Sequence, residues 1–455
     1  MAAIVADRNP PRKHIERTRI VLAPADRHSA ERVVQSIGVS RPTVWRVIGA
    51  GCPQILPPGK GKRPTIVLLR RGFGECRLKQ RVSSEASPML LISLICGLRL
   101  GLLDTRFSLR ERKICGYVVA GLLVVVMSFT ALSRVVWAAN VAPEILAFYY
   151  GWYGNPQVSG QWRHWKNVDP VNARAENVTD FPAYGTYDSH DPAVVDRQAE
   201  AARGAEITGF IASWWGPDSF EDRGMALLLA AAGKHKLSVS AYYEKIAGDD
   251  AASRIKAAVG DINYLLSHYG SDNAWLNAGG KPVLFVYSRA LHELLPADWQ
   301  EVIAQVRRDN PGGVVLIADS QDTAFASTFD GASTYNITGQ TQYKSSPEIR
   351  AWAHVTYPKM VAAAGPGKIS TVTIIPGYDD RKLWRLPPRP VTDRWGGETY
   401  RVLWQEVIAA APDYVLITSW NEWHEGSELE ASVEYGSRIL DSTAAFSREF
   451  LARQR

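Results

Sequence analysis

Short apolar segments alternate with amphipathic segments eight times between residue 145 and the C-terminus. Short, continuously apolar segments are typical of strands buried on both faces, and the segments between them have the spacing of helices that pack on a sheet. The expected strands are 145–150, 209–215, 238–244, 282–288, 314–319, 331–336, 371–376 and 414–420. The expected helices are 191–205, 222–235, 251–269, 299–309, 323–327, 348–364, 400–411 and 437–453.

This alternation predicts the class of fold. Eight strand–helix units in about 310 residues match the size and order of a (β/α)8 barrel, whose parallel strands need helical crossovers. An open, doubly wound sheet is the main alternative, but no glycine-rich phosphate turn follows any expected strand. We therefore predict an α/β protein in which residues 140–455 form a single (β/α)8 TIM barrel.

Charge divides the chain into a basic head and an acidic body. Of the 52 Lys+Arg and 46 Asp+Glu residues, 22 and 8 lie at or before Lys113, which leaves 30 and 38 for the body. An acidic body has no signature of polyanion binding, so we expect no nucleic-acid partner. Residues 1–112 carry no motif. We expect them to be a disordered cytoplasmic tail, or an over-extended reading frame whose true start is Met89 or Met127.

A hydrophobic segment separates the head from the body. Residues 114–133 form a run of 20 residues without a charge, preceded by the basic stretch 110–113 and followed by small residues around Ala138. This order resembles a secretory signal, and the run is long enough to span a bilayer. We predict that 113–139 is either a cleaved signal peptide or a membrane anchor, which places the body in the periplasm or outside the cell. A buried core helix is the alternative.

The positions of the cysteines and histidines limit which metals or cofactors the predicted barrel can bind. All four cysteines lie before residue 116, so the predicted barrel can hold neither a disulfide framework nor a cysteine-ligated metal. The histidines of the body, such as His164, His190 and His235, lack the spacing of metal ligands. We predict no metal and no other cofactor.

The ends of the expected strands carry aromatic rings, carboxylates and amides. Rings stack on the C–H faces of sugars, and polar edges bind sugar hydroxyls, so this set predicts a carbohydrate site. Packing at the barrel core or rim is the alternative for each single ring. The set comprises Tyr149, Tyr150, Trp152, Tyr153, Trp214, Trp215, Tyr243, Glu244, Tyr287, Tyr335, Asn336, Tyr378, Asp379, Asp380 and residues 421–426.

Glu422 and Glu425 are the strongest chemical signal, three residues apart in the segment that leaves the last expected strand. Burial and mutual repulsion are expected to keep one carboxyl of such a pair protonated and the other ionised. Glycoside hydrolysis needs one carboxyl that donates a proton and one that acts as nucleophile or base. We expect His424, between them, to orient or charge the two carboxylates; a metal site is the alternative. A solvated helix that carries two glutamates is the alternative for the pair.

Several segments together resemble glycoside hydrolase family 99, the endo-α-mannosidase and endo-α-1,2-mannanase family. The resemblance covers residues 145–453 and none of the head. Its most specific part is SWNEWHEG at 419–426. The others are AFYYGWYGNP at 147–156 and the shorter segments 164–165, 187–192, 213–215, 329–331 and 376–378.

The resemblance implies a retaining endo-hydrolase. Glu425 would be the general acid/base, and Glu422 would act as a base on the mannose 2-hydroxyl, so that the reaction passes through a 1,2-anhydro sugar. Trp215 would lie beside the subsite two sugars from the cleaved bond, and a Trp there resembles the bacterial type that favours mannose. Residues 384–395 and those after Glu244 depart from the family pattern, which leaves the distal substrate contacts open. The resemblance assigns the remaining cleft to Tyr150, Trp152, Glu244, Tyr335, Tyr378 and Arg394.

The sequence leaves three functions to be weighed. The first is an exported endo-acting α-mannoside hydrolase, with Glu422 and Glu425 as the catalytic residues and the strand-end set, including Trp214, Asn421 and His424, as substrate contacts. The second is a hydrolase of the same fold that acts on another polysaccharide, such as an exopolysaccharide. The third is a carbohydrate-binding protein without catalysis, which the presence of both carboxylates disfavours. We expect a monomer whose partner is a polysaccharide or oligosaccharide.

Overall fold

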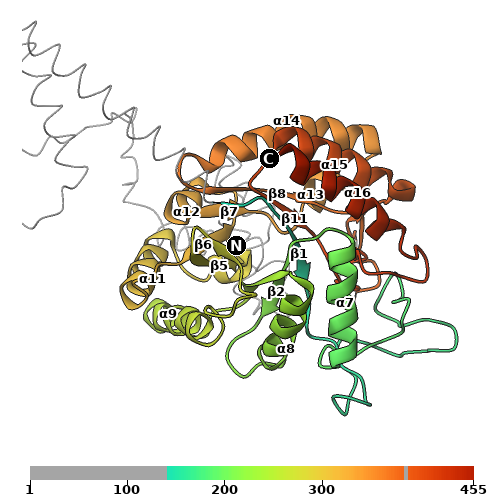
Figure 1. The fold of residues 1–455 in the computed structure, drawn as a ribbon, viewed down its shortest axis with the longest axis horizontal. Coiled ribbons are helices and arrows are strands. Elements are labelled where there is room, and N and C mark those ends of the chain that lie inside the picture. The colour runs from blue at the N-terminus through green and yellow to red at the C-terminus, as the bar shows by residue number, and fades with distance from the viewer. Residues whose placement is uncertain (1–140, 384–387, 455) are drawn as a thin grey trace, which may run out of the picture. The chain divides into compact units, whose positions relative to one another are not determined.

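The computed structural model describes residues 141–383 and 388–454, which form a barrel of parallel strands surrounded by helices (Figure 1). The predicted head 1–112 and the predicted signal or anchor segment 113–139 lie outside the described residues. Within the described part, no helix has both the length and the apolar character that crossing a bilayer requires.

Eight parallel strands build the barrel. Each pairs with the next in chain order, β3 pairs with β5, and β1 pairs with β11, which closes the sheet. The barrel strands are β1 (Glu144–Tyr149), β2 (Gly209–Trp214), β3 (Ser238–Tyr243), β5 (Lys281–Val286), β6 (Val315–Asp319), β7 (Gly331–Ser333), β8 (Ile369–Ile374) and β11 (Tyr414–Ile417). Outside the barrel, β4 (Asn277–Ala278) pairs antiparallel with β5, and β9 (Tyr378–Asp379) pairs antiparallel with β10 (Val391–Thr392). The (β/α)8 prediction is confirmed.

Helices follow the barrel strands at the predicted positions. The first begins as expected, because the Asp191 side chain accepts a hydrogen bond from the Ala193 N–H and Pro192 occupies the first turn. The long helices are α7 (Pro192–Gly204), α8 (Phe220–His235), α9 (Ala251–His268), α11 (Pro296–Asp309), α14 (Ser346–Ala364), α15 (Glu398–Ala410) and α16 (Arg438–Arg453). The short ones are α12 (Thr323–Thr328), α10 (Ser288–Leu291), α13 (Thr338–Thr341) and the 3-10 turn η1 (Trp395–Gly397), of which only α12 was predicted.

The alternation of side chains along each strand sorts the core into two layers. In β1, Ile145 and Ala147 face outward and pack with residues of the surrounding helices, whereas Leu146 and Phe148 face inward and fill the barrel. Both sets are fully or almost fully buried. This double burial explains why the strands read as continuous apolar runs rather than as alternating ones.

Two strands, β7 and β11, each end three residues earlier than predicted. After β7, the Tyr335 N–H donates to the Asp319 carboxylate (2.8 Å) instead of joining the ladder. After β11, the Ser419 N–H donates to the Ser427 carbonyl (2.8 Å), so the chain closes a loop there. The residues released from the two strands form walls of the site at this end of the barrel.

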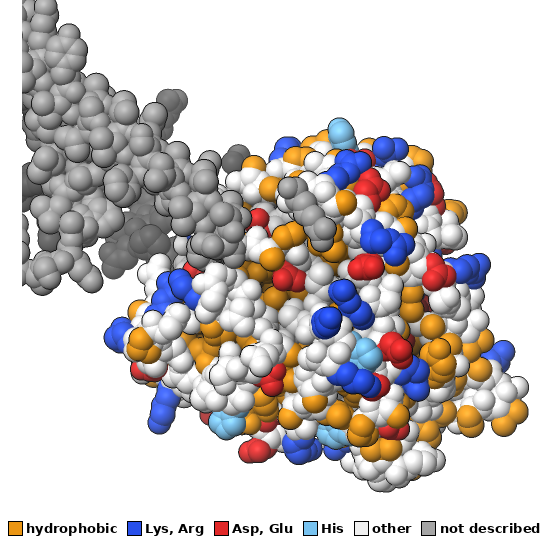
Figure 2. Space-filling model, in the orientation of Figure 1, with side chains coloured by type: hydrophobic (Ala, Val, Ile, Leu, Met, Phe, Trp, Pro, Cys, Tyr) orange, Lys and Arg blue, Asp and Glu red, His pale blue; other side chains and the backbone are white. Residues whose placement is uncertain are grey.

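The surface carries charges of both signs. The face in Figure 2 shows Lys and Arg side chains interspersed with Asp and Glu rather than gathered in a single field. Such a surface gives no electrostatic footprint of a nucleic-acid site on the visible face.

Candidate active site

The SWNEWHEG loop leaves β11 at the carboxyl end of the barrel, where barrel enzymes carry their active sites. Hydrogen bonds inside the loop and hydrogen bonds to Tyr150, at the end of β1, fix its backbone. The Ser419 hydroxyl accepts from the Glu422 N–H (2.7 Å). The Asn421 side chain accepts from the Tyr150 N–H (2.7 Å) and donates to the Tyr150 carbonyl (3.0 Å). Gly426 ends the loop with a φ of 55°, a left-handed conformation that suits glycine.

Tyr187 ties the same loop to a buried carboxyl. Its hydroxyl accepts from the Asn421 amide (3.0 Å) and from the Trp423 indole N–H (2.9 Å), and it donates to Glu430 (2.8 Å). Glu430 also accepts from Gln198 (2.8 Å). Every member of this network is buried, so it fixes where the loop places Glu422 and Glu425.

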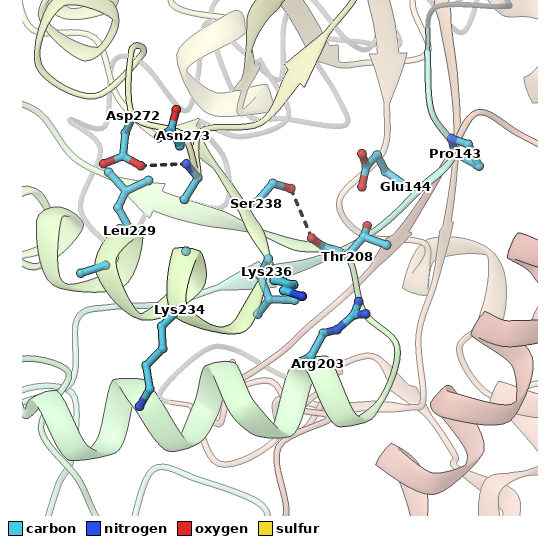
Figure 3. Close-up of a pocket in the computed structure, with 14 residues that line it drawn as sticks. Pro143, Glu144, Arg203, Thr208, Leu229, Lys234, Lys236, Ser238, Asp272 and Asn273 are labelled. Carbon is cyan, nitrogen blue, oxygen red and sulfur yellow. Dashed lines mark hydrogen bonds between the residues drawn. The ribbon is translucent and has the colours of Figure 1, made fainter.

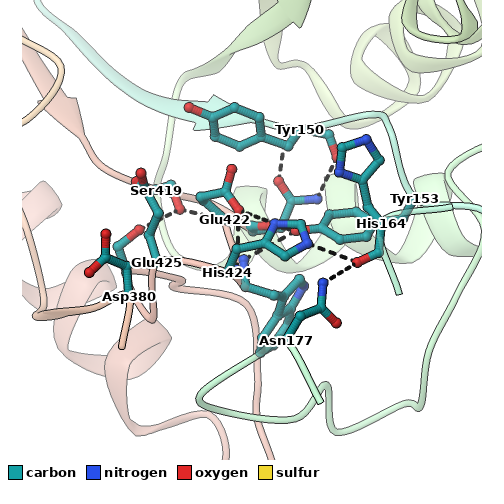
Figure 4. Close-up of polar contacts among 12 residues, drawn as sticks. Tyr150, Tyr153, His164, Asn177, Asp380, Ser419, Glu422, His424 and Glu425 are labelled. Atoms are coloured by element: carbon teal, nitrogen blue, oxygen red, sulfur yellow. Dashed lines mark hydrogen bonds and ion pairs between the residues drawn. The ribbon is translucent and has the colours of Figure 1, made fainter. Parts of the chain in front are cut away.

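Glu422 and His424 form a close pair within the loop. The Glu422 side chain is 6% exposed, and its Oε1 lies 2.6 Å from Nδ1 of His424. The other ring nitrogen of His424 lies 2.8 Å from the backbone carbonyl of His164 (Figure 4). Burial lowers the pKa of His424, but Glu422 and the hydrogen bonds outweigh burial and leave the pKa raised. The contacts therefore hold Glu422, and the prediction that His424 orients or charges the two carboxylates stays a prediction.

Glu425 is half-buried and is held by two tyrosines. Tyr335 donates to its Oε2 (2.8 Å), and the Tyr378 hydroxyl lies 3.1 Å from Oε1. Tyr378 also lies 3.2 Å from Asp380, whose carboxylate accepts from the Arg389 guanidinium (3.0 Å). A single hydroxyl hydrogen can serve one acceptor at a time. When this hydrogen points to Asp380, the Tyr378 oxygen can accept a hydrogen bond from protonated Glu425, so the site can hold Glu425 as an acid.

A cleft of about 440 Å³ opens beside both carboxylates. This volume suits a few sugar rings. Trp152 and His164 form one wall, with their rings stacked at 4.5 Å and 2° between planes. The cleft is lined by Trp152, His164, Lys166, Asn177, Leu383, Glu422, His424 and Glu425.

A second polar cluster lies at the ends of β2 and β3. Glu244 accepts from the Ser213 hydroxyl (2.8 Å) and from the Arg289 guanidinium (3.1 Å), and Trp215 donates to the same Ser213 hydroxyl (3.0 Å). The Arg289 guanidinium also covers one face of the Trp215 ring at 4.5 Å. Burial raises the pKa of Glu244 to about 7.

Tyr150 lies between the cluster around Glu244 and the cleft. Its pKa is raised by burial and then by the charges of Glu244, Glu422 and Glu425. Its ring packs against Trp152 at 4.5 Å. The fold therefore brings three carboxylates, predicted from two separate segments, into one region around a single tyrosine.

The structure places three predicted substrate contacts outside the lining of the cleft. Trp214 is fully buried and donates to Asp222 (2.7 Å), because strand alternation turns it outward to the helices. Asn421 is fully buried and binds the end of β1. Arg394 is buried beneath the loop, where it donates to the Gly426 carbonyl (3.1 Å) and pairs with Glu428 (2.5 Å).

Several cleft residues were missed as substrate contacts by sequence reasoning. His164 was noted within a family segment and among the scattered histidines, and Asn177 was not singled out as a substrate contact. In the structure the Asn177 amide donates to the His164 carbonyl (2.8 Å), which fixes this wall of the cleft. Lys166 and Leu383 follow no strand end directly, and no local pattern could have identified them, because loops bring them in. Arg289, which binds Glu244, directly follows the expected strand 282–288, so its position was a signal that could have found it.

A larger hollow of about 600 Å³ lies at the opposite end of the barrel (Figure 3). Its lining includes Glu144 at the start of β1 and Ser238 at the start of β3, with Thr208 just before β2. Ser238 donates to the Thr208 carbonyl (3.3 Å). Side chains at the amino ends of barrel strands serve stability rather than catalysis, so we place the active site in the smaller cleft.

Replacing the buried Glu430 by Gln is expected to flatten the pH dependence of stability. Burial raises the pKa of Glu430 from 4.5 to about 7, so between these values the folded protein keeps a proton that the unfolded chain has released. The free energy of unfolding therefore falls as pH rises through this window, by up to about 1.4 kcal/mol per pH unit from this group. Urea unfolding at several pH values measures the slope. An equal slope in wild type and Glu430→Gln would contradict the assignment.

The fold and the site together define a barrel enzyme of the carbohydrate-active class. Two carboxylates and an aromatic wall meet in one cleft at the carboxyl ends of the strands. No cluster of three or more His, Cys, Asp and Glu side chains that could hold a metal occurs among residues 141–383 and 388–454. The chain belongs to glycosyl hydrolase family 99, whose family model matches residues 141–443, and it is a glycoside hydrolase.

Known proteins resemble the same part of the chain. It is 28% identical over 324 residues to the glycoprotein endo-alpha-1,2-mannosidase of Mus musculus, which covers 63% of this chain and 67% of the mouse protein. It is 28% identical over 332 residues to a glycoprotein endo-alpha-1,2-mannosidase-like protein of Danio rerio, covering 64% and 71%. The solved structure of the GH99 endo-alpha-mannosidase from Bacteroides thetaiotaomicron shares the fold, with a TM-score of 0.57, 24% identity, and coverage of 68% of this chain and 98% of that one.

Proposed function

We propose that this glycoside hydrolase is a retaining, endo-acting α-mannosidase of the endo-α-1,2 type. The observation that carries the proposal is that the side chains of Glu422 and Glu425 come from the same loop and line the same aromatic-walled cleft. The relatives named as endo-alpha-1,2-mannosidases support the choice of mannose. The natural partner is then an α-mannan or a mannose-capped glycan.

In the proposed first step, Glu425 protonates the departing glycosidic oxygen while Glu422 removes the proton from the 2-hydroxyl of the cleaved mannose. The 2-oxygen then attacks the anomeric carbon, and a 1,2-anhydro sugar forms as the bond to the leaving sugar breaks. In the second step, Glu425 takes a proton from water, which opens the three-membered ring, and Glu422 returns its proton to the 2-oxygen. Two inversions retain the anomeric configuration.

We also propose that the enzyme acts outside the cytoplasm. The support is the uncharged run 114–133 behind a basic flank, which has the order of an export signal or anchor. Fractionation of cells that express the full chain, followed by N-terminal sequencing of the mature protein, tests this. A product that stays in the cytoplasm with an intact segment 113–139 would overturn it.

The reaction itself is tested by incubating the full chain with yeast-type α-mannan and following new reducing ends by mass spectrometry. We expect short mannosides with retained anomeric configuration, as read by NMR of the first product. If α-mannan stays intact while another polysaccharide is cut, the alternative of an exopolysaccharide hydrolase replaces this proposal. Binding without turnover on any glycan would favour the carbohydrate-binding alternative.

Trp215→Ala is expected to weaken the binding of a mannoside by about 1–3 kcal/mol, because a half-buried ring beside Glu244 offers a stacking face for a sugar. Calorimetry in the inactive Glu425→Gln background measures affinity without turnover. Trp352, half-buried on α14, is the matched control, and Trp352→Ala should leave affinity unchanged. Unchanged affinity in a folded Trp215→Ala protein would make Trp215 a structural residue.

A further inference from the structure

His424 faces a hydrogen-bond acceptor at each of its two ring nitrogens. Nε2 lies 2.8 Å from the His164 carbonyl oxygen, and Nδ1 lies 2.6 Å from Oε1 of Glu422. The His164 carbonyl also accepts from the Asn177 amide (2.8 Å), and a carbonyl has no proton to give. Nε2 of His424 must therefore carry a hydrogen.

The contact at Nδ1 then requires a second proton. A neutral imidazole with its hydrogen on Nε2 would direct the Nδ1 lone pair at a carboxylate oxygen only 2.6 Å away, which is repulsive. The proton lies either on Nδ1, as an imidazolium beside a carboxylate, or on Glu422, as a carboxylic acid beside a neutral ring. The surrounding charges decide between these two forms.

The groups around His424 favour the imidazolium. Burial opposes a charged ring, but the carboxylates of Glu422 and Glu425 and the His164 carbonyl attract it, and together they raise the pKa of His424. On the side of the preceding loop, the ring meets Tyr153, whose ring centroid lies 5.7 Å away, and the imidazole of His164 at 5.5 Å. Lys166, which lines the same cleft, is the nearby cation on that wall.

We propose that His424 is a positioning residue that stands as an imidazolium and pins Oε1 of Glu422, so that Oε2 is the oxygen that exchanges a proton with the substrate. Both contacts from His424, the ring Nδ1 and the backbone N–H (3.1 Å), go to Oε1. This inference rests on the proposed function for the role of Oε2. The need for two protons between the ring and Glu422 rests on the two ring contacts, and the assignment of the second one to Nδ1 rests on the surrounding carboxylates.

The imidazolium also balances charge during the proposed reaction. In the first step the 2-hydroxyl proton passes to Oε2 of Glu422 while the Glu425 proton passes to the leaving oxygen. The imidazolium stays charged and faces a Glu425 that has become a carboxylate. In the second step Glu422 returns its proton to the 2-oxygen, and the imidazolium again faces a carboxylate at Oε1. The number of protons in the site is unchanged after each full cycle.

Nitrogen NMR of the full chain labelled with 15N-histidine tests the protonation state without any substrate. The chain has nine histidines, and the His424 signals are assigned by their loss in His424→Asn. At neutral pH we expect both His424 nitrogens to be protonated in the wild type. In Glu422→Gln we expect a bare Nδ1, because the amide can donate to it. A bare Nδ1 in the wild type would overturn the proposal. If His424→Asn fails to fold, the signals that change in Glu422→Gln make the assignment instead.

Kinetics on α-mannan tests the catalytic consequence. His424→Asn keeps an N–H that can reach Oε1 but removes the charge, so kcat should fall roughly tenfold or more with little change in KM. The alkaline limb of the pH profile that reflects loss of the imidazolium should disappear in this variant. A folded variant with wild-type kcat and pH profile would overturn the positioning role. If no glycan is cleaved by the wild type, the proposed function fails while the NMR result still decides the protonation state.

His354 is the matched control. It pairs with Glu406 (2.9 Å) in the same kind of histidine–glutamate contact, but it lies on α14, outside the cleft. His354→Asn should leave kcat, KM and the pH profile unchanged. An equal loss in both variants would show a general effect on the fold rather than a role of His424 in the site.

Discussion

Glu425→Gln is expected to abolish the cleavage of α-mannan, with a loss of about 10²–10⁴-fold or more in kcat/KM. The substitution removes the proton donor for the departing sugar while keeping a side chain of the same size that the Tyr335 and Tyr378 hydroxyls can still contact. Reducing-end assays on the purified variant measure the loss. Turnover at the wild-type rate would remove Glu425 from the acid/base role.

A substrate with a good leaving group distinguishes the catalytic roles of Glu422 and Glu425. Such a group departs without a proton, so it should restore much of the first step in Glu425→Gln but not in Glu422→Gln, where the base is missing. Glu301→Gln, at an exposed position on α11, is the matched control and should keep full activity. Rescue of both variants, or of neither, would contradict the division of roles.

Arg394→Met is expected to destabilise the protein by about 3–5 kcal/mol, because it leaves a buried carboxyl without its partner. Arg394 pairs with Glu428 (2.5 Å), which is 1% exposed, and its guanidinium also donates to the Gly426 and Glu428 carbonyls. The loss should appear as a lower urea midpoint, and activity should fall as the end of the SWNEWHEG loop loosens.

Two comparisons make this result specific. Arg401→Met breaks the pair with Glu398 (2.5 Å), in which both side chains are 42% exposed, and should cost less than about 1 kcal/mol. The double variant Arg394→Met with Glu428→Leu removes both charges and should recover part of the stability lost by Arg394→Met. A cost below about 1 kcal/mol for Arg394→Met, or unchanged stability with weakened glycan binding, would return Arg394 to the list of substrate contacts.

The sequence alone predicted the barrel, the sites of its strands and the loop that carries Glu422 and Glu425. Strand and helix patterns are local, because burial on both faces of a strand and on one face of a helix imposes a period on neighbouring residues. The position of the carboxylates followed from the same pattern, since the carboxyl ends of parallel strands meet at one end of a barrel. Trp214 and Asn421, which the structure places outside the cleft lining, lie at or just after these strand ends as well, so the sequence predicted their position near the site but not the direction of their side chains.

The tertiary structure decided in which direction each side chain points. Trp214 and Trp215 are neighbours in sequence, yet strand alternation buries the first among the helices and leaves the second beside Glu244. His424 contacts Glu422 within its own loop, but it meets a second acceptor, the His164 carbonyl, only because the fold brings the two histidines together across 260 positions. Contacts across such separations depend on how whole strands and loops pack in space, and no local period records them.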